Sequence, residues 1–154
     1  MMTTPAPDNF FAFEQLLVTR LQAQLADISP RVKIITSADL AGITEAQQVT
    51  PAVQVIYRGY RVQDVRTDGR AARFEQTWLT VVATRNVASL RSGDAARLDA
   101  GVIALRVLKA LMGHTLPGSS RPLRPVDAPE AAYSAGFMYL PLAFAAELAI
   151  TNPI

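Results

Sequence analysis

RFEQTWLTVVATR (Arg73–Arg85) and GFMYLPLAFAAELAI (Gly136–Ile150) are the two stretches of this sequence that decide its fold. In both, side-chain character alternates with a period of two, over a length that predicts a long β-strand. The first stretch carries Phe74, Trp78 and Val82 on one face and further apolar residues on the other. Because a strand that is apolar on both faces needs cover on both, we expect a helix on one side and consider a partner subunit for the other.

The second stretch has an almost purely apolar face that runs from Met138 to Ile150, and an opposite face that includes Tyr139, Pro141 and Glu147. Pro141 cannot donate a hydrogen bond to a neighbouring strand. This position therefore predicts a sheet edge, a bulge or a place where strand pairing changes.

Two segments carry the three- and four-residue apolar spacing of an amphipathic helix. The first runs from Phe10 to Leu25, with Asp8 or Asn9 available as its cap. The second runs from Ala95 to Met112, and Gly113 is a natural C-terminal stop. Its expected buried stripe consists of Leu98, Val102, Leu105, Leu108 and Met112.

Shorter segments complete the expected framework. Apolar or alternating runs at Val32–Thr36 and Ala52–Arg58 predict two more strands, and Ser37–Ile43 predicts a helical turn between them. Residues 59–72, called the arm below, are polar and contain the turn signal Asp68-Gly69. Residues 114–130 hold four prolines and predict an extended, proline-rich loop, whose length indicates a surface with a function.

Together these elements predict an α+β fold, with a mainly antiparallel or mixed β-sheet of about four to five strands packed against two main α-helices. The chain has 154 residues, half of them apolar, which suits a single domain. We place this domain at residues 9–154 and a flexible N-terminal tail at residues 1–8.

The composition argues against most chemistry. The chain has no cysteine, which excludes disulfides, thiolate catalysis and cysteine-ligated metals. Its one histidine, His114, has no acidic partner nearby in the sequence, so we predict no catalytic, cofactor or metal site and no enzyme activity. The net charge of +2 is scattered, which argues against specific nucleic-acid binding, and neither a signal peptide nor a membrane span is expected.

Arginine and tyrosine concentrate around the arm, and both residue types are favoured at protein interfaces. A solvated hairpin with loose ion pairs would explain the same pattern. The residues that we predict to form an interface are Tyr57, Arg58, Tyr60, Arg61, Arg66, Arg70 and Trp78.

Taken in order, the segments VKIITSADLAGI, TPAVQVIYRGY, FEQTWLTVVATRN, DAARLDAGVIALRVLKALMG and GFMYLPLAFAAELAI resemble a bacteriophage tail terminator protein. The sequence is similar to the terminators of Mu-like phages and prophages, which are related in fold to those of siphophages. The resemblance covers about Phe10 to Ile150. It rests on element order and on weak motifs, chiefly Gln76-x-Trp78 and Gly136-x-x-Tyr139-x-x-x-x-Phe144.

This resemblance implies a structural virion protein of the phage tail, assembled in the host bacterial cytoplasm. It would form a homohexameric ring at the head-proximal end of the tail tube, stop tail polymerisation and offer the surface for head-tail joining at the neck. The implied partners are further copies of itself, the tail tube protein, a neck or head-tail connector protein and, in a contractile tail, the sheath protein. No cofactor or catalytic residue is implied.

Two alternatives remain open on the sequence alone. One is another head-tail connector or tail-completion protein, which would also form rings. The other is an α+β small-molecule-binding domain or enzyme, in which the two long strands would wall a pocket.

Overall fold

The computed structural model describes residues 8–85 and 94–153, without the side chains of residues 94–98. The expected tail at residues 1–8 thus lies almost wholly outside the described residues, as does the side chain of Leu98. The elements are α1 (Ala12–Gln24), β1 (Lys33–Thr36), α2 (Ser37–Leu40), η1 (Glu45–Gln47), β2 (Ala52–Gln63), β3 (Ala71–Arg85), α3 (Asp94–Leu111), β4 (Arg124–Val126), β5 (Ala132–Ser134) and β6 (Phe137–Thr151).

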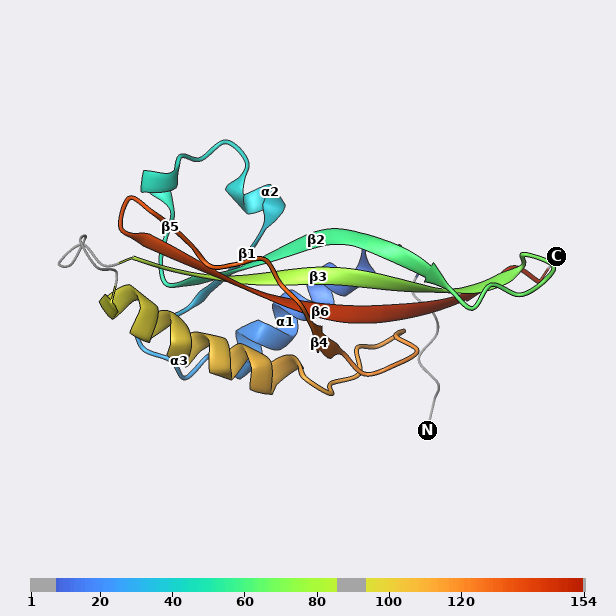
Figure 1. Ribbon diagram of the computed structural model, residues 1–154. Helices are drawn as coiled ribbons and strands as arrows, with labels where there is room; N and C mark the ends of the chain where they lie inside the picture. Colours follow the sequence, from blue (N-terminus) through green and yellow to red (C-terminus); the bar gives the residue numbers. More distant parts are fainter. Residues whose placement is uncertain (1–7, 86–93, 154) are drawn as a thin grey trace.

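Six strands form one mixed sheet in the order β1-β2-β3-β6-β4, and β5 pairs with β6 as well. Only β1 and β2 are parallel, and all the other pairs are antiparallel. Helices α1 and α3 lie against one side of the sheet, and α2 and η1 lie on the other side at one end (Figure 1). The expected α+β class is confirmed, with short β4 inside the proline-rich loop and β5 just after it as strands that the sequence did not reveal.

Pro141 marks a change of pairing, which is one of the three outcomes that its missing N–H group predicted. Along the outer edge of β6, residues 137–139 pair with β5 and residues 143–145 pair with β4. Pro141 lies between these two ladders, while its other side stays in register with Val81 of β3. The missing N–H group therefore coincides with the gap between two short edge strands.

The helix-side face of the sheet is organised around Trp78, which has no exposed surface. Its indole N–H donates to Gln76 Oε1 at 2.9 Å, and Gln76 Nε2 donates to the backbone oxygen of Phe10 at 2.6 Å. Since an indole can only donate, this bond also fixes the orientation of the buried amide of Gln76. The motif Gln76-x-Trp78 thus holds the segment that leads into α1 against the centre of the sheet.

The buried face of α3 differs from the predicted stripe. Val102, Leu105 and Met112 are exposed by 63%, 52% and 51%, although the sequence placed them in the core. The buried face instead consists of Ala100, Ile103, Ala104, Val107, Ala110 and Leu111. The helix is apolar around most of its circumference, so periodicity alone offers two stripes. The stripe that contains the small alanines allows α3 to approach β3, β6 and α1 closely.

The two main helices are also tied to one another by arginine side chains. Arg20 Nε donates to the backbone oxygen of Ala110 at 3.0 Å, and Arg106 Nη2 donates to that of Gln24 at 2.9 Å. No helix in the described part of the chain combines the length and apolarity needed to cross a bilayer.

The Trp78–Gln76–Phe10 chain predicts a large effect for Gln76→Leu. This change keeps most of the side-chain volume but leaves a buried indole N–H and a backbone oxygen without a partner. We expect the free energy of unfolding to fall by about 2–4 kcal/mol, measured by urea denaturation. Gln15→Leu, on the exposed side of α1, is the control and should change stability by less than about 0.5 kcal/mol.

The buried face of α3 seen in the structure predicts that the same substitution, valine to alanine, has different effects on stability at two positions of this helix. Val107→Ala removes two fully buried methyl groups and should lower the free energy of unfolding by about 2 kcal/mol. Val102→Ala removes the same groups from a solvated site, where alanine favours the helix, and should be neutral within about 0.5 kcal/mol. If urea denaturation showed a larger loss of stability for Val102→Ala, the result would instead support the buried stripe that the sequence predicted.

Candidate interaction surfaces

The arm is the free end of a three-stranded extension rather than a two-stranded hairpin. Strand β2 turns into β3 at residues 64–70, and the end of β6 runs alongside, with Ala71 paired to Thr151. Figure 1 shows these three strands continuing past the helices to the end of the molecule where the C-terminus lies. Since neither helix covers this part, both of its faces are available for contact.

A β-bulge at Arg58 sets which face each arm residue occupies. Tyr57 pairs with Trp78, but the next pair in the register is Gly59 with Thr77, so Arg58 is the extra residue. Gly59 has a backbone φ of +138°, a value that residues other than glycine rarely adopt. Because of the extra residue, Tyr57 and Tyr60 face the helix side together, and the ring of Phe10 contacts both.

The tip of the arm is shaped by an arginine that the sequence marked as an interface residue. Arg66 donates to both carboxylate oxygens of Asp68 at 2.8 and 2.9 Å, and the backbone N–H of Arg70 donates to the same carboxylate at 3.0 Å. The Arg66 hydrogen bond, followed by that of the Arg70 N–H, lowers the pKa of Asp68 below its usual range. Asp68 therefore stays ionised, and Arg66 stabilises the turn through its hydrogen bonds to Asp68.

The predicted interface residues do not form one patch. Arg58, Tyr60, Arg61, Arg66 and Arg70 are exposed, but Tyr60 and Arg61 point to opposite faces of the sheet. Two others lie further inside: Tyr57 is half-buried, with its pKa raised by burial, and Trp78 belongs to the core of the subunit itself. Strand alternation thus divides the set between an aromatic face and a charged face.

The charged face contains two buried glutamates directly opposite one another. Glu75 of β3 pairs with Glu147 of β6 in the register, and they are only 8% and 6% exposed. Like charges in this arrangement repel, so each needs cationic partners. Arginines on several segments supply them: Arg61 at 3.3 Å and Arg124 for Glu75, and Arg73 at 3.7 Å and Arg121 at 3.5 Å for Glu147.

This cluster attaches the proline-rich loop to the base of the arm. Arg121 and Arg124 come from the loop, and Ser120 Oγ donates to Glu147 Oε1 at 2.8 Å. The sequence indicated a surface function for this loop. The contacts with Glu75 and Glu147 give it a structural role. The spacing of the residues gave no signal for this cluster, since its members lie on four separate segments.

At the other end of the sheet, η1 crosses the charged side and contacts β5 and β6. Glu45 accepts hydrogen bonds from Ser134 Oγ at 2.9 Å and from the Tyr139 hydroxyl at 2.6 Å. Burial, followed by the Glu45 hydrogen bond, raises the pKa of Tyr139 to about 12. The Tyr139 hydroxyl therefore keeps its proton at physiological pH and holds η1 across the sheet.

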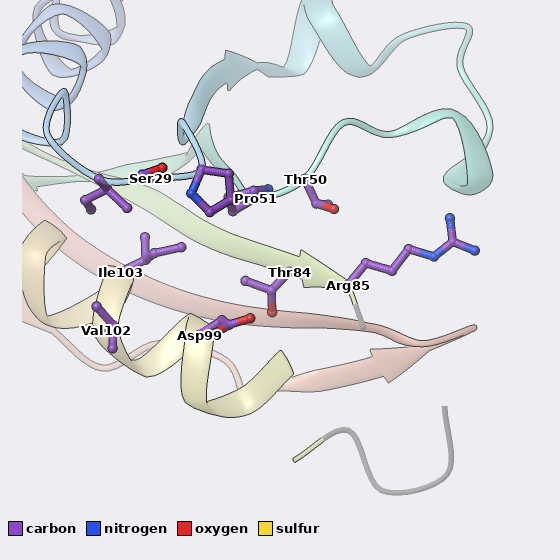
Figure 2. A pocket seen from close by; sticks show the side chains of 10 residues that line it. Ser29, Thr50, Pro51, Thr84, Arg85, Asp99, Val102 and Ile103 are labelled. Atoms are coloured by element: carbon purple, nitrogen blue, oxygen red, sulfur yellow. The ribbon is translucent and has the colours of Figure 1, made fainter. Parts of the chain in front are cut away.

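A cavity of about 320 Å³ lies beside the N-terminal half of α3 and is lined by Ser29, Thr50, Thr84, Arg85, Asp99 and apolar neighbours. In Figure 2 the guanidinium group of Arg85 extends away from Asp99; it lies over the ring of Phe137, 4.8 Å from the centroid. The end of β3 contributes Thr84 and Arg85 to the lining, but β6 contributes no residue, whereas the small-molecule alternative expects both long strands to form the walls. Its lining offers hydroxyl groups but no histidine.

His114 lies apart from this cavity. Burial and then the charge of Arg20 lower its pKa, so its imidazole is neutral at physiological pH. Among the side chains that the structure describes, no group of three metal-ligating residues comes together.

The sequence matches a known protein family. The family model described as "Phage tail terminator protein" matches residues 7–153. Among solved structures, a chain of the "Virion of native gene transfer agent (GTA) particle" aligns with 16% identity and a TM-score of 0.49, covering 90% of this chain and 96% of that one. No curated protein matches the chain.

The glutamate pair predicts that Arg124→Ala destabilises the fold. The change leaves Glu75 buried opposite Glu147 with Arg61 as its remaining cation, and Arg61 is itself 72% exposed. We expect a loss of about 2 kcal/mol in the free energy of unfolding, measured by urea denaturation. Arg70→Ala, whose side chain makes no ion pair with any described residue, is the matched control. Equal effects of the two changes would contradict the role of Arg124.

Proposed function

Because the chain belongs to the phage tail terminator protein family, we propose that it forms a homohexameric ring at the head-proximal end of a phage tail tube. The ring stops polymerisation of the tube and provides the surface to which the neck is joined. The family match carries this proposal, since it spans residues 7–153 and so almost the whole chain. Membership of this family supports a role as a structural component of the virion tail rather than as an enzyme.

The partners follow from this position. One side of the ring contacts the last ring of tail tube protein, and the other contacts a neck or head-tail connector protein. In a contractile tail the outer rim also meets the sheath protein. Assembly takes place in the cytoplasm of the host bacterium, on a tube that has reached its final length. Residues 9–154 act as one domain.

A ring of this kind requires two different and complementary patches on each subunit. The arm supports one of them, because it extends past the helices and carries exposed arginines on a rigid three-stranded base. We assign Arg58, Tyr60, Arg61, Arg66 and Arg70 to contacts with a neighbouring subunit or with the end of the tube. Tyr57 and Trp78 contribute by supporting Tyr60 from the core.

The structure identifies which arginines can be changed without damage to the fold. Reversal of Arg61 would place a third carboxylate beside Glu75 and Glu147, and reversal of Arg66 would break the turn at Asp68. Arg58 and Arg70 make no ion pair with any described residue, so Arg58→Glu with Arg70→Glu tests assembly alone.

We expect this double variant to keep the circular dichroism spectrum and urea midpoint of the unchanged protein, yet to cap isolated tail tubes about tenfold less tightly. Negative-stain electron microscopy of protein mixed with tubes measures the capping. Lys109→Glu, an exposed reversal on α3, should leave it unchanged.

Six-fold rings, or caps on one end of each tube, support a terminator. Binding to the portal side of the neck in place of the tube would favour another head-tail connector. Particles that neither form rings nor bind tubes would contradict the proposed function.

A further inference from the structure

The sheet has two open edges, which lie at opposite ends of the strand order. β1 forms one edge, and β4 and β5, both paired with the outer side of β6, form the other. Edge strands present backbone groups that can pair with another chain. The two edges differ in charge and in shape.

The β1 edge is hollowed on both sides. Lys33 N–H donates to the backbone oxygen of Pro51 at 3.0 Å, so strand alternation turns the backbone groups of Ile34 outward. Grooves of about 670 and 470 Å³ flank β1, and Val49 lines both. Val49 and Ile43, which lines the second groove, are exposed by 58% and 42%. The edge thus offers room and apolar contact to an added extended segment.

The β1 edge is also positively charged. Arg31 and Lys33 are exposed, line the larger groove and make no ion pair within the described part of the chain. The acidic side chain lining the flanking grooves is Asp39, which accepts hydrogen bonds from the backbone N–H and the hydroxyl of Thr36. The two cations therefore have no acidic neighbour that satisfies them.

The opposite edge supplies the complementary charge. Residues 127–133, with the sequence DAPEAAY, run from the end of β4 into β5 and are exposed throughout. Asp127 and Glu130 make no ion pair with the described residues, and Tyr133 is 55% exposed. An acidic, extended segment thus stands at the edge away from the cationic groove.

We infer that the β1 edge of one copy receives residues 127–133 of a second copy, which closes the ring edge to edge. This rests on the proposed function, and charge complementarity selects the occupant. By the pairing directions, β1 runs opposite to β4 and β5. A rotation axis along the strands preserves their directions, so the two edges meet antiparallel. In the register that places Arg31 opposite Glu130, Lys33 lies opposite Ala128, one residue along the chain from Asp127.

Cysteine cross-linking tests this contact directly, because the chain has no cysteine of its own. In one subunit the two edges are separated by four strand spacings, about 19 Å, far beyond the reach of a disulfide. Arg31→Cys with Glu130→Cys should therefore give a ladder of covalent oligomers up to the closed ring on a non-reducing gel. Each of the two single-cysteine variants should give covalent dimers as its largest product.

Charge exchange gives an independent measurement. Arg31→Glu with Lys33→Glu should weaken association at least tenfold, and so should Asp127→Lys with Glu130→Lys, each by placing like charges together. An equimolar mixture of the two variants should regain rings, because each altered edge then meets an opposite charge. Analytical ultracentrifugation and electron microscopy measure association, with Lys109→Glu as the control.

The outcomes separate this inference from the proposed function. Wild-type rings without a ladder, or without rescue in the mixture, overturn the edge-to-edge contact and leave the terminator function standing. A ladder from a protein that never caps tubes supports the contact but contradicts the function. Absence of rings, of caps on tube ends and of the ladder overturns both.

Discussion

The hydrogen-bond chain from the Trp78 indole through the Gln76 amide to the backbone oxygen of Phe10 is the constraint on which the rest of this structure depends. It is buried and has a single allowed orientation, so its donors and acceptors must be matched inside the protein. It also fixes where the chain enters α1, and it positions the Phe10 ring against Tyr57, Tyr60 and Phe74. The aromatic packing at the base of the arm therefore depends on this hydrogen-bond chain.

The long strands of the sheet extend beyond the helices that pack against them. The helices cover only part of β3 and β6, which leaves an arm whose helix-side face is aromatic and whose other face is charged. Two buried glutamates in direct opposition would weaken such a sheet if they stood alone. The arginines of the proline-rich loop neutralise them, so the loop and the arm form one unit. A rigid projection of this kind suits a contact made by docking rather than by folding.

The sequence predicted the parts of the fold that local pattern controls. The period of two located β2, β3 and β6, the spacing in α1 located its buried face, and the missing N–H of Pro141 located the change of pairing. The local sequence pattern did not predict the structure correctly where it allowed two arrangements and tertiary packing determined which of them forms. Helix α3 has two apolar stripes, and its packing against the sheet selected the one with alanines. The bulge at Arg58, which reassigns Tyr60 to the helix side, had only Gly59 as its signal, and the glutamate pair depends on a register that sequence spacing does not reveal.

The open edges explain how a sheet protein could remain unassembled until it meets its template. β1 has four residues, and β4 and β5 have three each, interrupted by Pro125 and Pro129. Short, broken and charged edges resist uncontrolled pairing, so a single contact between two copies is weak. In the proposed closed ring every subunit would make two such contacts at once, and a tube end that held six arms in place would raise their effective concentration. Weak edges and a projecting arm are therefore complementary parts of the proposal: the arm would bind the tube, and the tube would make edge pairing favourable only where it ends.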